Sequence, residues 1–193
     1  MQPFKEGVKR MLEQRIIEHC APTLAGIKSG NLFRYRFTCR EEVFQELAEI
    51  NTKLNIRGVF VEVVRWEEDA VLIYAYRKSH LEKELRQDGV YELLGEYGYP
   101  DCEVRNCLEH LKKRLYEYDC FPHEIGVFLG YPLEDVKGFI RYKGKECKYC
   151  GLWKVYSNEQ ETRKLFDKIK KCNLIYSKVF ASGRSISQMT VRK

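Results

Sequence analysis

Two runs of β-favouring residues near the middle of the chain constrain its fold more than any other feature. Residues 59–66 and 70–77 are rich in valine, isoleucine and tyrosine, and three acidic residues separate them. Two such runs joined by a short polar link predict a β-hairpin. Residues 31–37 and 152–156 predict two further strands. Because a strand and a helix precede the hairpin, we expect an α+β fold in which several helices pack a mixed sheet of about four strands.

Most of the remaining apolar residues recur at helical spacing. Thr38 and Glu41 form a capping-box pattern before one such stretch. Pro22 interrupts the first stretch, and because proline is favoured at the first position of a helix, it predicts a short second helix. The predicted helices are 4–19, 22–27, one that the Thr38 cap starts and that runs through Leu54, 79 to near 95 or 98, 104–115, two short helices within 121–144, and a last helix that starts at 158.

The length of the chain and the absence of an internal break predict one domain over residues 1–193. The sequence contains no internal repeat and no linker long enough to divide it. A chain of about 200 residues usually closes around one core, and a hydrophobic fraction of 44% is enough to build it. The tail from 183 to 193 is polar and basic, and we expect it to fray.

Charge and apolar patterning indicate where the protein works. No apolar run reaches the roughly 18–20 residues that span a bilayer, and the first residues lack the pattern of a secretory signal. We therefore expect a cytoplasmic protein, with no membrane partner, whose eight cysteines stay reduced. The net charge of +6 is modest and no nucleic-acid-binding motif accompanies it, so the sequence does not favour nucleic acid as a partner.

Three segments resemble the signatures of a known family. They are HCAPTLAGIKSGNLF at 19–33, FPHEIGVFLGYPLEDVKGFI at 121–140 and GLWKVY at 151–156. The chain resembles, over nearly its whole length, a bacterial family of similar size that occurs chiefly in anaerobic Firmicutes and is known only as a domain of unknown function. The resemblance implies a cytoplasmic bacterial protein. It implies no activity, ligand, cofactor or catalytic residue.

Cys20 is the first candidate for chemistry. If Pro22 opens a helix, Cys20 lies at the N-terminus of that helix, where the helix dipole favours a thiolate. The alternative is that Cys20 closes the preceding helix as a buried thiol. Most cysteines that are not in disulfides are such packing residues, and the sequence alone favours this alternative.

His123 and Glu124 are the second candidate. An imidazole next to a carboxylate can act as a general base, and Asp135 could orient it, which would give a set of Cys20, His123 and an acid. The alternative, which the pattern favours, is that Pro122, His123 and Glu124 begin a short helix. Cations near these segments could hold an anionic ligand. The residues proposed for ligand binding are Lys28, Arg77, Asp135 and Lys154.

Cys147 and Cys150 have the two-residue spacing of a metal knuckle or a redox dithiol. A structural zinc site usually shows a second such pair or two histidines, and neither follows in the sequence. A redox dithiol opens a helix after a strand, whereas this pair precedes a predicted strand. We therefore predict no metal site at these cysteines.

Three functions from different classes remain after this reading, in decreasing order of support. The first is a small enzyme or ligand-binding protein with a site made by the Cys20 and His123 segments. The second is a metal- or redox-linked accessory protein that uses Cys147 and Cys150. The third is an interaction protein. We expect the partner to be a small molecule or a protein. The sequence does not identify that partner, a cofactor or the oligomeric state.

Overall fold

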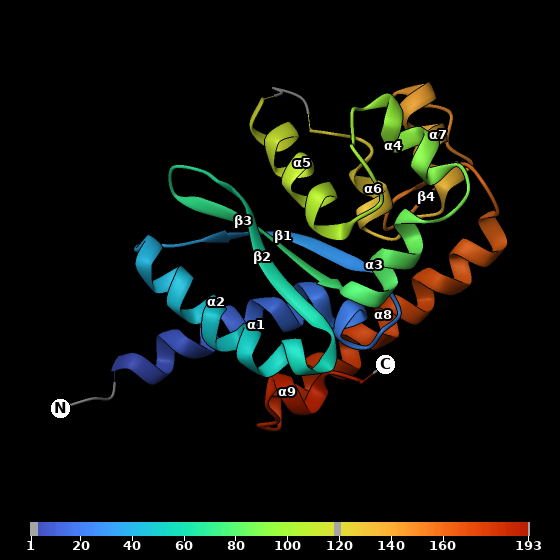
Figure 1. The fold of residues 1–193 in the computed structure, drawn as a ribbon. Coiled ribbons are helices and arrows are strands. Elements are labelled where there is room, and N and C mark those ends of the chain that lie inside the picture. Colours follow the sequence, from blue (N-terminus) through green and yellow to red (C-terminus); the bar gives the residue numbers. More distant parts are fainter. Residues whose placement is uncertain (1–3, 118–120, 193) are drawn as a thin grey trace. The chain divides into compact units, whose positions relative to one another are not determined.

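The computed structural model describes residues 4–117 and 121–192, with side chains described from Met11 onward. The chain divides into two compact units, and Figure 1 labels the elements of both. Unit 1 consists of Met1–Lys78 and Cys172–Lys193, and unit 2 of Ser79–Lys171. Helices surround one three-stranded and one two-stranded sheet, so the predicted α+β class is confirmed. The single domain expected over residues 1–193 stays a prediction.

The sheet of unit 1 is antiparallel, with strand order β1-β3-β2. Its strands are β1 (Gly30–Arg36), β2 (Val59–Trp66) and β3 (Ala70–Arg77). The β2–β3 hairpin is therefore confirmed. The predicted mixed sheet of four strands is wrong. β3 lies between β1 and β2 and pairs antiparallel with both, so the two strands that α2 connects are not neighbours. The fourth predicted strand belongs to a separate hairpin in unit 2.

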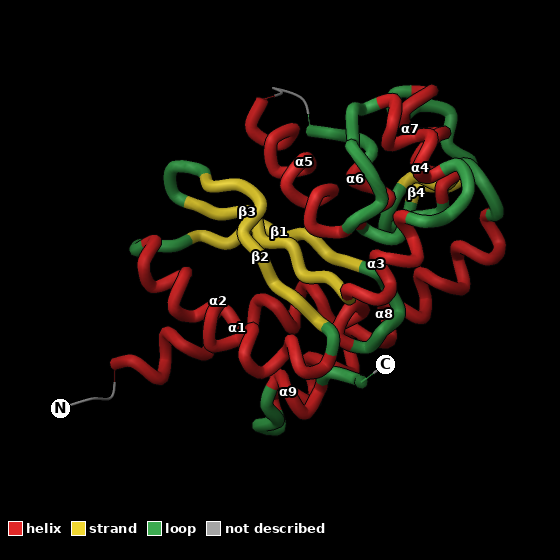
Figure 2. Tube along the Cα trace, viewed as in Figure 1, coloured by secondary structure: helices red, strands yellow, loops and turns green. Residues whose placement is uncertain are grey.

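Helices cover one face of this sheet. α1 (Phe4–Leu24) contacts β1 and β3, and α2 (Arg40–Leu54) contacts β2, as the red helices beside the yellow strands in Figure 2 show. A 3-10 turn, η1 (Asn55–Arg57), follows α2. α2 has Cys39 at its N-cap, without a side-chain cap. The capping box predicted at Thr38 does not form.

Pro22 lies inside α1 and does not open a second helix. The helix continues to Leu24, and the backbone N–H groups of Ile27 and Lys28 then turn back to bond the carbonyl of Pro22 at 2.8 and 3.2 Å. A proline near the end of a helix removes one hydrogen bond without breaking the last turn. The predicted helix at 22–27 is therefore wrong.

The C-terminal segment is folded rather than frayed. Ser185 and Gln188 form a capping box at the start of α9 (Ile186–Met189). Ile186 is fully buried in the core of unit 1. The N–H of Val191 donates to the carbonyl of Leu24 at 3.0 Å. Apolar burial and backbone pairing together hold a segment that its polar composition predicted to be loose.

Unit 2 is mainly helical. Its elements are α3 (Lys78–Leu85, which begins at the last residue of unit 1), α4 (Val90–Glu96), α5 (Val104–Glu117), α6 (Ile125–Phe128), α7 (Leu133–Tyr142), β4 (Tyr149–Cys150), β5 (Lys154–Val155) and the first half of α8 (Glu159–Ala181). β4 pairs with β5 in a hairpin, and α7 contacts both α6 and β5. The predicted start of the last helix is confirmed: Asn158 accepts a hydrogen bond from the N–H of Glu161 at 3.2 Å. In the part of the chain that the structure describes, no helix combines the length and the apolar character needed to cross a membrane.

Candidate functional site

Unit 2 contains a pocket of about 250 Å³, which we call the α6–α7 pocket. It lies among α6, α7 and the β4–β5 hairpin, and most of its lining is apolar or aromatic. His123 and Phe121 are exposed, so the pocket reaches the surface. The lining residues are Phe121, His123, Ile125, Gly126, Tyr131, Asp135, Val136, Phe139, Trp153 and Lys154. Three of the predicted site residues, His123, Asp135 and Lys154, are thus brought together here.

Asp135 joins α7 to the hairpin. Its side chain is 2% exposed. One carboxylate oxygen accepts the indole N–H of Trp153 at 2.8 Å, and the other accepts the backbone N–H groups of Tyr156 and Ser157, each at 2.8 Å. A buried carboxylate costs several kcal/mol unless hydrogen bonds stabilise it, and these donors do so. Asp135 is therefore a positioning residue that fixes Trp153 in the pocket wall.

Aromatic rings form the wall. Tyr131 stacks on Trp153 with ring centroids 4.4 Å apart, and Phe166 meets Trp153 edge-on at the same distance. The His123 ring contacts Phe139 edge-to-face at 5.0 Å. Burial raises the pKa of Tyr131. These ring pairs make a rigid apolar surface, since each ring has a packed neighbour.

Lys154 brings a cation to the pocket. Its ammonium donates a hydrogen bond to the carbonyl of Gly144, and its side chain is half-buried. Among the described residues no carboxylate forms an ion pair with it. An ammonium has three donors, so Lys154 keeps donors for another acceptor.

Glu124 does not line the pocket. It is fully buried, forms an ion pair with Arg114, and accepts a hydrogen bond from Tyr99 Oη at 3.3 Å. Burial, with Glu124 as the second cause, raises the pKa of Tyr99. Glu124 stands at the N-cap of α6 without a side-chain cap hydrogen bond. Its contacts make it a structural anion, and they do not place it beside a ligand.

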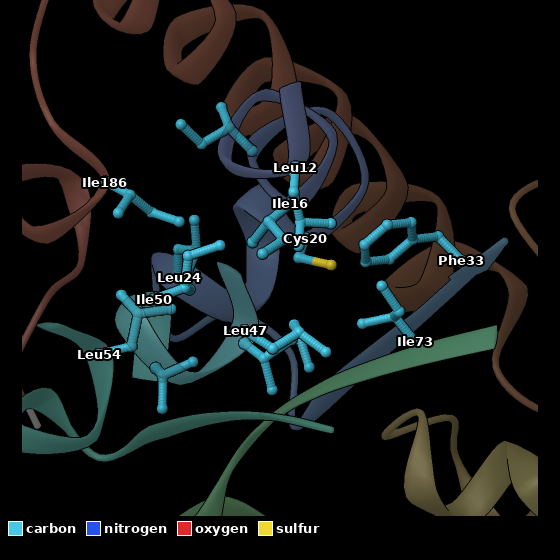
Figure 3. Packing of buried hydrophobic residues seen from close by; sticks show 14 of the residues in the cluster. Leu12, Ile16, Cys20, Leu24, Phe33, Leu47, Ile50, Leu54, Ile73 and Ile186 are labelled. Carbon is cyan, nitrogen blue, oxygen red and sulfur yellow. The ribbon is translucent and has the colours of Figure 1, made fainter. Parts of the chain in front are cut away.

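Cys20 lies in unit 1, near the C-terminal end of α1, and not at a helix N-terminus. It is fully buried, and Figure 3 shows it among apolar side chains of the same core. Burial raises the pKa of its thiol. The apolar stripe to which it belongs is visible in the sequence at every fourth residue: Leu12, Ile16, Cys20 and Leu24. Because Cys20 and His123 belong to different units, their pairing stays a prediction.

Lys28 and Arg77 also belong to unit 1, apart from the α6–α7 pocket. Lys28 is 8% exposed, and burial lowers its pKa to about 8. Arg77 is almost fully buried, and its guanidinium donates to the carbonyls of Thr23 at 2.6 Å, Leu24, and Val191 at 2.7 Å. Two of these carbonyls belong to the last turn of α1 and the third to the C-terminal segment, so Arg77 ties the end of α1 to that segment. Its donors serve the backbone, which explains its burial without a ligand.

Cys147 lies two residues before β4, and Cys150 is the last residue of β4. Both are free thiols and at least partly exposed. No group of three or more potential metal-ligating side chains occurs within residues 11–117 and 121–192. The hairpin that carries them is held by rings: Arg163 lies 3.6 Å from the ring centroid of Tyr149, which in turn packs on Phe166. A Cβ on Gly151 would overlap the Phe166 ring, so this glycine is required by packing.

The sequence reasoning missed the aromatic lining of the pocket. Phe121, Tyr131, Phe139 and Trp153 all lie in the segments that it singled out, but no one of them carries a motif. Aromatic residues placed close to glycines were the available signal. A Cβ on Gly126 would lie 2.8 Å from Val136, which shows how closely α6 and α7 approach.

A family model described as "protein of unknown function (DUF3793)" matches residues 16–190 of the chain. Searches of curated proteins and of solved structures find no significant match.

Proposed function

Because this chain belongs to a family of unknown function, DUF3793, we propose its function from the geometry of the α6–α7 pocket: it binds a small molecule with a flat, largely apolar body. The observation that carries the proposal is a surface pocket of about 250 Å³ with rigid aromatic walls and a few polar groups. Small-molecule sites combine these features. A cavity of about 150 Å³ holds benzene and drug-sized sites begin near 300 Å³, so the size fits a compound with one or two rings.

The groups in the pocket favour binding over covalent catalysis. Among the lining residues that the structure describes, none is a cysteine, a serine or a threonine. Asp135 uses both carboxylate oxygens on hairpin donors, which removes it as a base. His123 and Lys154 remain as polar contacts that orient a ligand. The site therefore supports a ligand-binding protein. We propose a reducing, cytoplasmic location, in which the cysteines stay as thiols.

The proposal is tested with three single-ring probes of one skeleton: phenylacetate, phenylacetamide and phenethylamine. We expect at least one to bind the full-length protein with a Kd of about 1 mM or tighter, measured by calorimetry and ligand-observed NMR. Phe121→Ala removes one wall of the pocket at a residue that is 41% exposed. It should weaken binding by about fivefold, which corresponds to about 1 kcal/mol of ring contact.

Phe44→Ala is the matched control, because Phe44 is 56% exposed and lies in unit 1, outside this pocket. It should leave the affinity unchanged. Circular dichroism checks that both variants fold. The absence of saturable binding for all three probes, or an equal loss of affinity in both variants, would refute the proposal.

A further inference from the structure

We infer that the natural ligand of the α6–α7 pocket is an aromatic carboxylate, whose ring lies on the aromatic wall and whose carboxylate meets Lys154. This inference rests on the proposed function and names its ligand class. Lys154 and the exposed imidazole of His123 both line the pocket. They bring hydrogen-bond donors to a site whose other contacts are mostly carbon, and therefore favour a ligand with an acceptor group.

The environment of Lys154 favours an anion. Lys154 is half-buried in a mostly apolar lining, and only the Gly144 carbonyl accepts a hydrogen bond from its ammonium among the described residues. A partly desolvated cation without an opposite charge is electrostatically unfavourable, and a carboxylate within hydrogen-bond distance offsets that cost. Lys154 is carried by β5, which pairs with β4, so its backbone is held in place before a ligand arrives.

The single carboxylate among the described lining residues does not reverse this preference. Asp135 is buried, and its two oxygens already accept one indole and two backbone N–H groups. These donors offset its charge where it lies. A ligand therefore meets the positive end of Lys154 rather than a carboxylate with open acceptor sites.

The ring geometry argues against a cationic ligand. Sites for quaternary ammonium ions present several ring faces to the cation. In this pocket the face of Tyr131 packs on the face of Trp153, with an interplanar angle of 21°, so these faces cover each other. Lys154 would also repel a cation. The rest of the apolar lining, which includes Phe121 and Phe139, provides a surface on which a flat ligand can lie.

The experiment compares the three charge states of one skeleton: phenylacetate, phenylacetamide and phenethylamine. We expect phenylacetate to bind most tightly to the unmodified protein. Lys154→Gln keeps a donor for the Gly144 carbonyl and removes the charge. It should weaken phenylacetate binding by about tenfold, the lower end for a hydrogen bond to a charged group, and leave phenylacetamide binding unchanged. Lys154→Arg, which restores a cation, should recover most of the loss.

Lys145→Gln is the control, because Lys145 is exposed in the loop before the hairpin and does not line the pocket. It should change no affinity. If phenylacetamide or phenethylamine binds as tightly as phenylacetate, or if Lys154→Gln weakens all probes equally, the charge assignment is wrong while the binding function stands. If no probe binds, both the proposed function and this inference are wrong.

Discussion

At the scale of single residues, buried charge is the most unusual feature of unit 1. Lys28 is 8% exposed, and burial, partly opposed by the neighbouring Cys20, lowers its pKa from 10.5 to about 8. Such a lysine binds its proton more readily in the unfolded chain than in the folded one. Protonation therefore favours unfolding, and this destabilisation is complete below about pH 8 and disappears as the pH rises toward the ordinary lysine value of about 10.4. The pKa difference corresponds to about 3 kcal/mol.

Lys28→Met should abolish this pH dependence. We expect the free energy of unfolding of the unmodified protein, minus that of Lys28→Met, to rise by up to about 3 kcal/mol between about pH 7 and about pH 10. The difference is the correct quantity, because buried tyrosines and thiols with raised pKa values, such as Tyr76 and Cys107, lower the stability of both proteins at high pH. Urea unfolding at several pH values measures it. Lys178 is exposed, and Lys178→Met is the control. If the difference in unfolding free energy for Lys28→Met stays constant with pH, or equals the difference measured for Lys178→Met, then Lys28 is not desolvated.

At the scale of elements, the contact between α7 and the hairpin depends on one glycine. A Cβ on Gly138 would overlap the side chain of Tyr156, which directly follows β5. We expect Gly138→Ala to destabilise the protein by about 1–3 kcal/mol, despite the better helix propensity of alanine, because overpacking forces the elements apart. Chemical denaturation measures the change. The same variant should weaken ligand binding, since α7 and the hairpin both form the pocket wall.

Gly95→Ala is the matched control for that prediction. Gly95 lies in α4, also within unit 2, and a Cβ there meets no atom within 4 Å. Alanine should therefore stabilise the protein by about 0.5–1 kcal/mol, which is the propensity difference alone. Equal effects of the two substitutions would mean that α7 and Tyr156 do not approach closely.

At the scale of the whole molecule, the cysteines that the structure describes do not gather into a metal site. Cys147 and Cys150 belong to unit 2, while Cys20 and Cys172 belong to unit 1, and the described residues contain no cluster of three potential ligands. Tight zinc binding needs four ligands, or three and an open position. We expect elemental analysis of the purified protein to find well below one equivalent of zinc or iron. One equivalent that is lost in Cys147→Ser would contradict this and favour the metal-linked function.

Local patterns in the sequence determined most of the secondary structure. Alternation and β propensity defined the β2–β3 hairpin, helical spacing defined α2, α5 and α8, and Asn158 marked the start of α8. These features depend on neighbours within a few residues, and such patterns are legible in one chain. The sequence also singled out the segment of residues 121–140, which carries eight of the ten described lining residues of the pocket. It did so through residues that amphipathic packing left unexplained.

The tertiary structure alone decided how distant segments combine. It placed β3 between β1 and β2, turned the polar tail into α9, and committed Arg77 to the backbone ends of α1 and the C-terminal segment. It also brought Asp135 to Trp153 and so built a pocket from residues without a motif. Each outcome depends on contacts between residues far apart in sequence, where the partner determines whether a charge is satisfied or a side chain is buried. No local pattern carries that information, because the same polar residue suits a solvated loop and a fully hydrogen-bonded interior equally well.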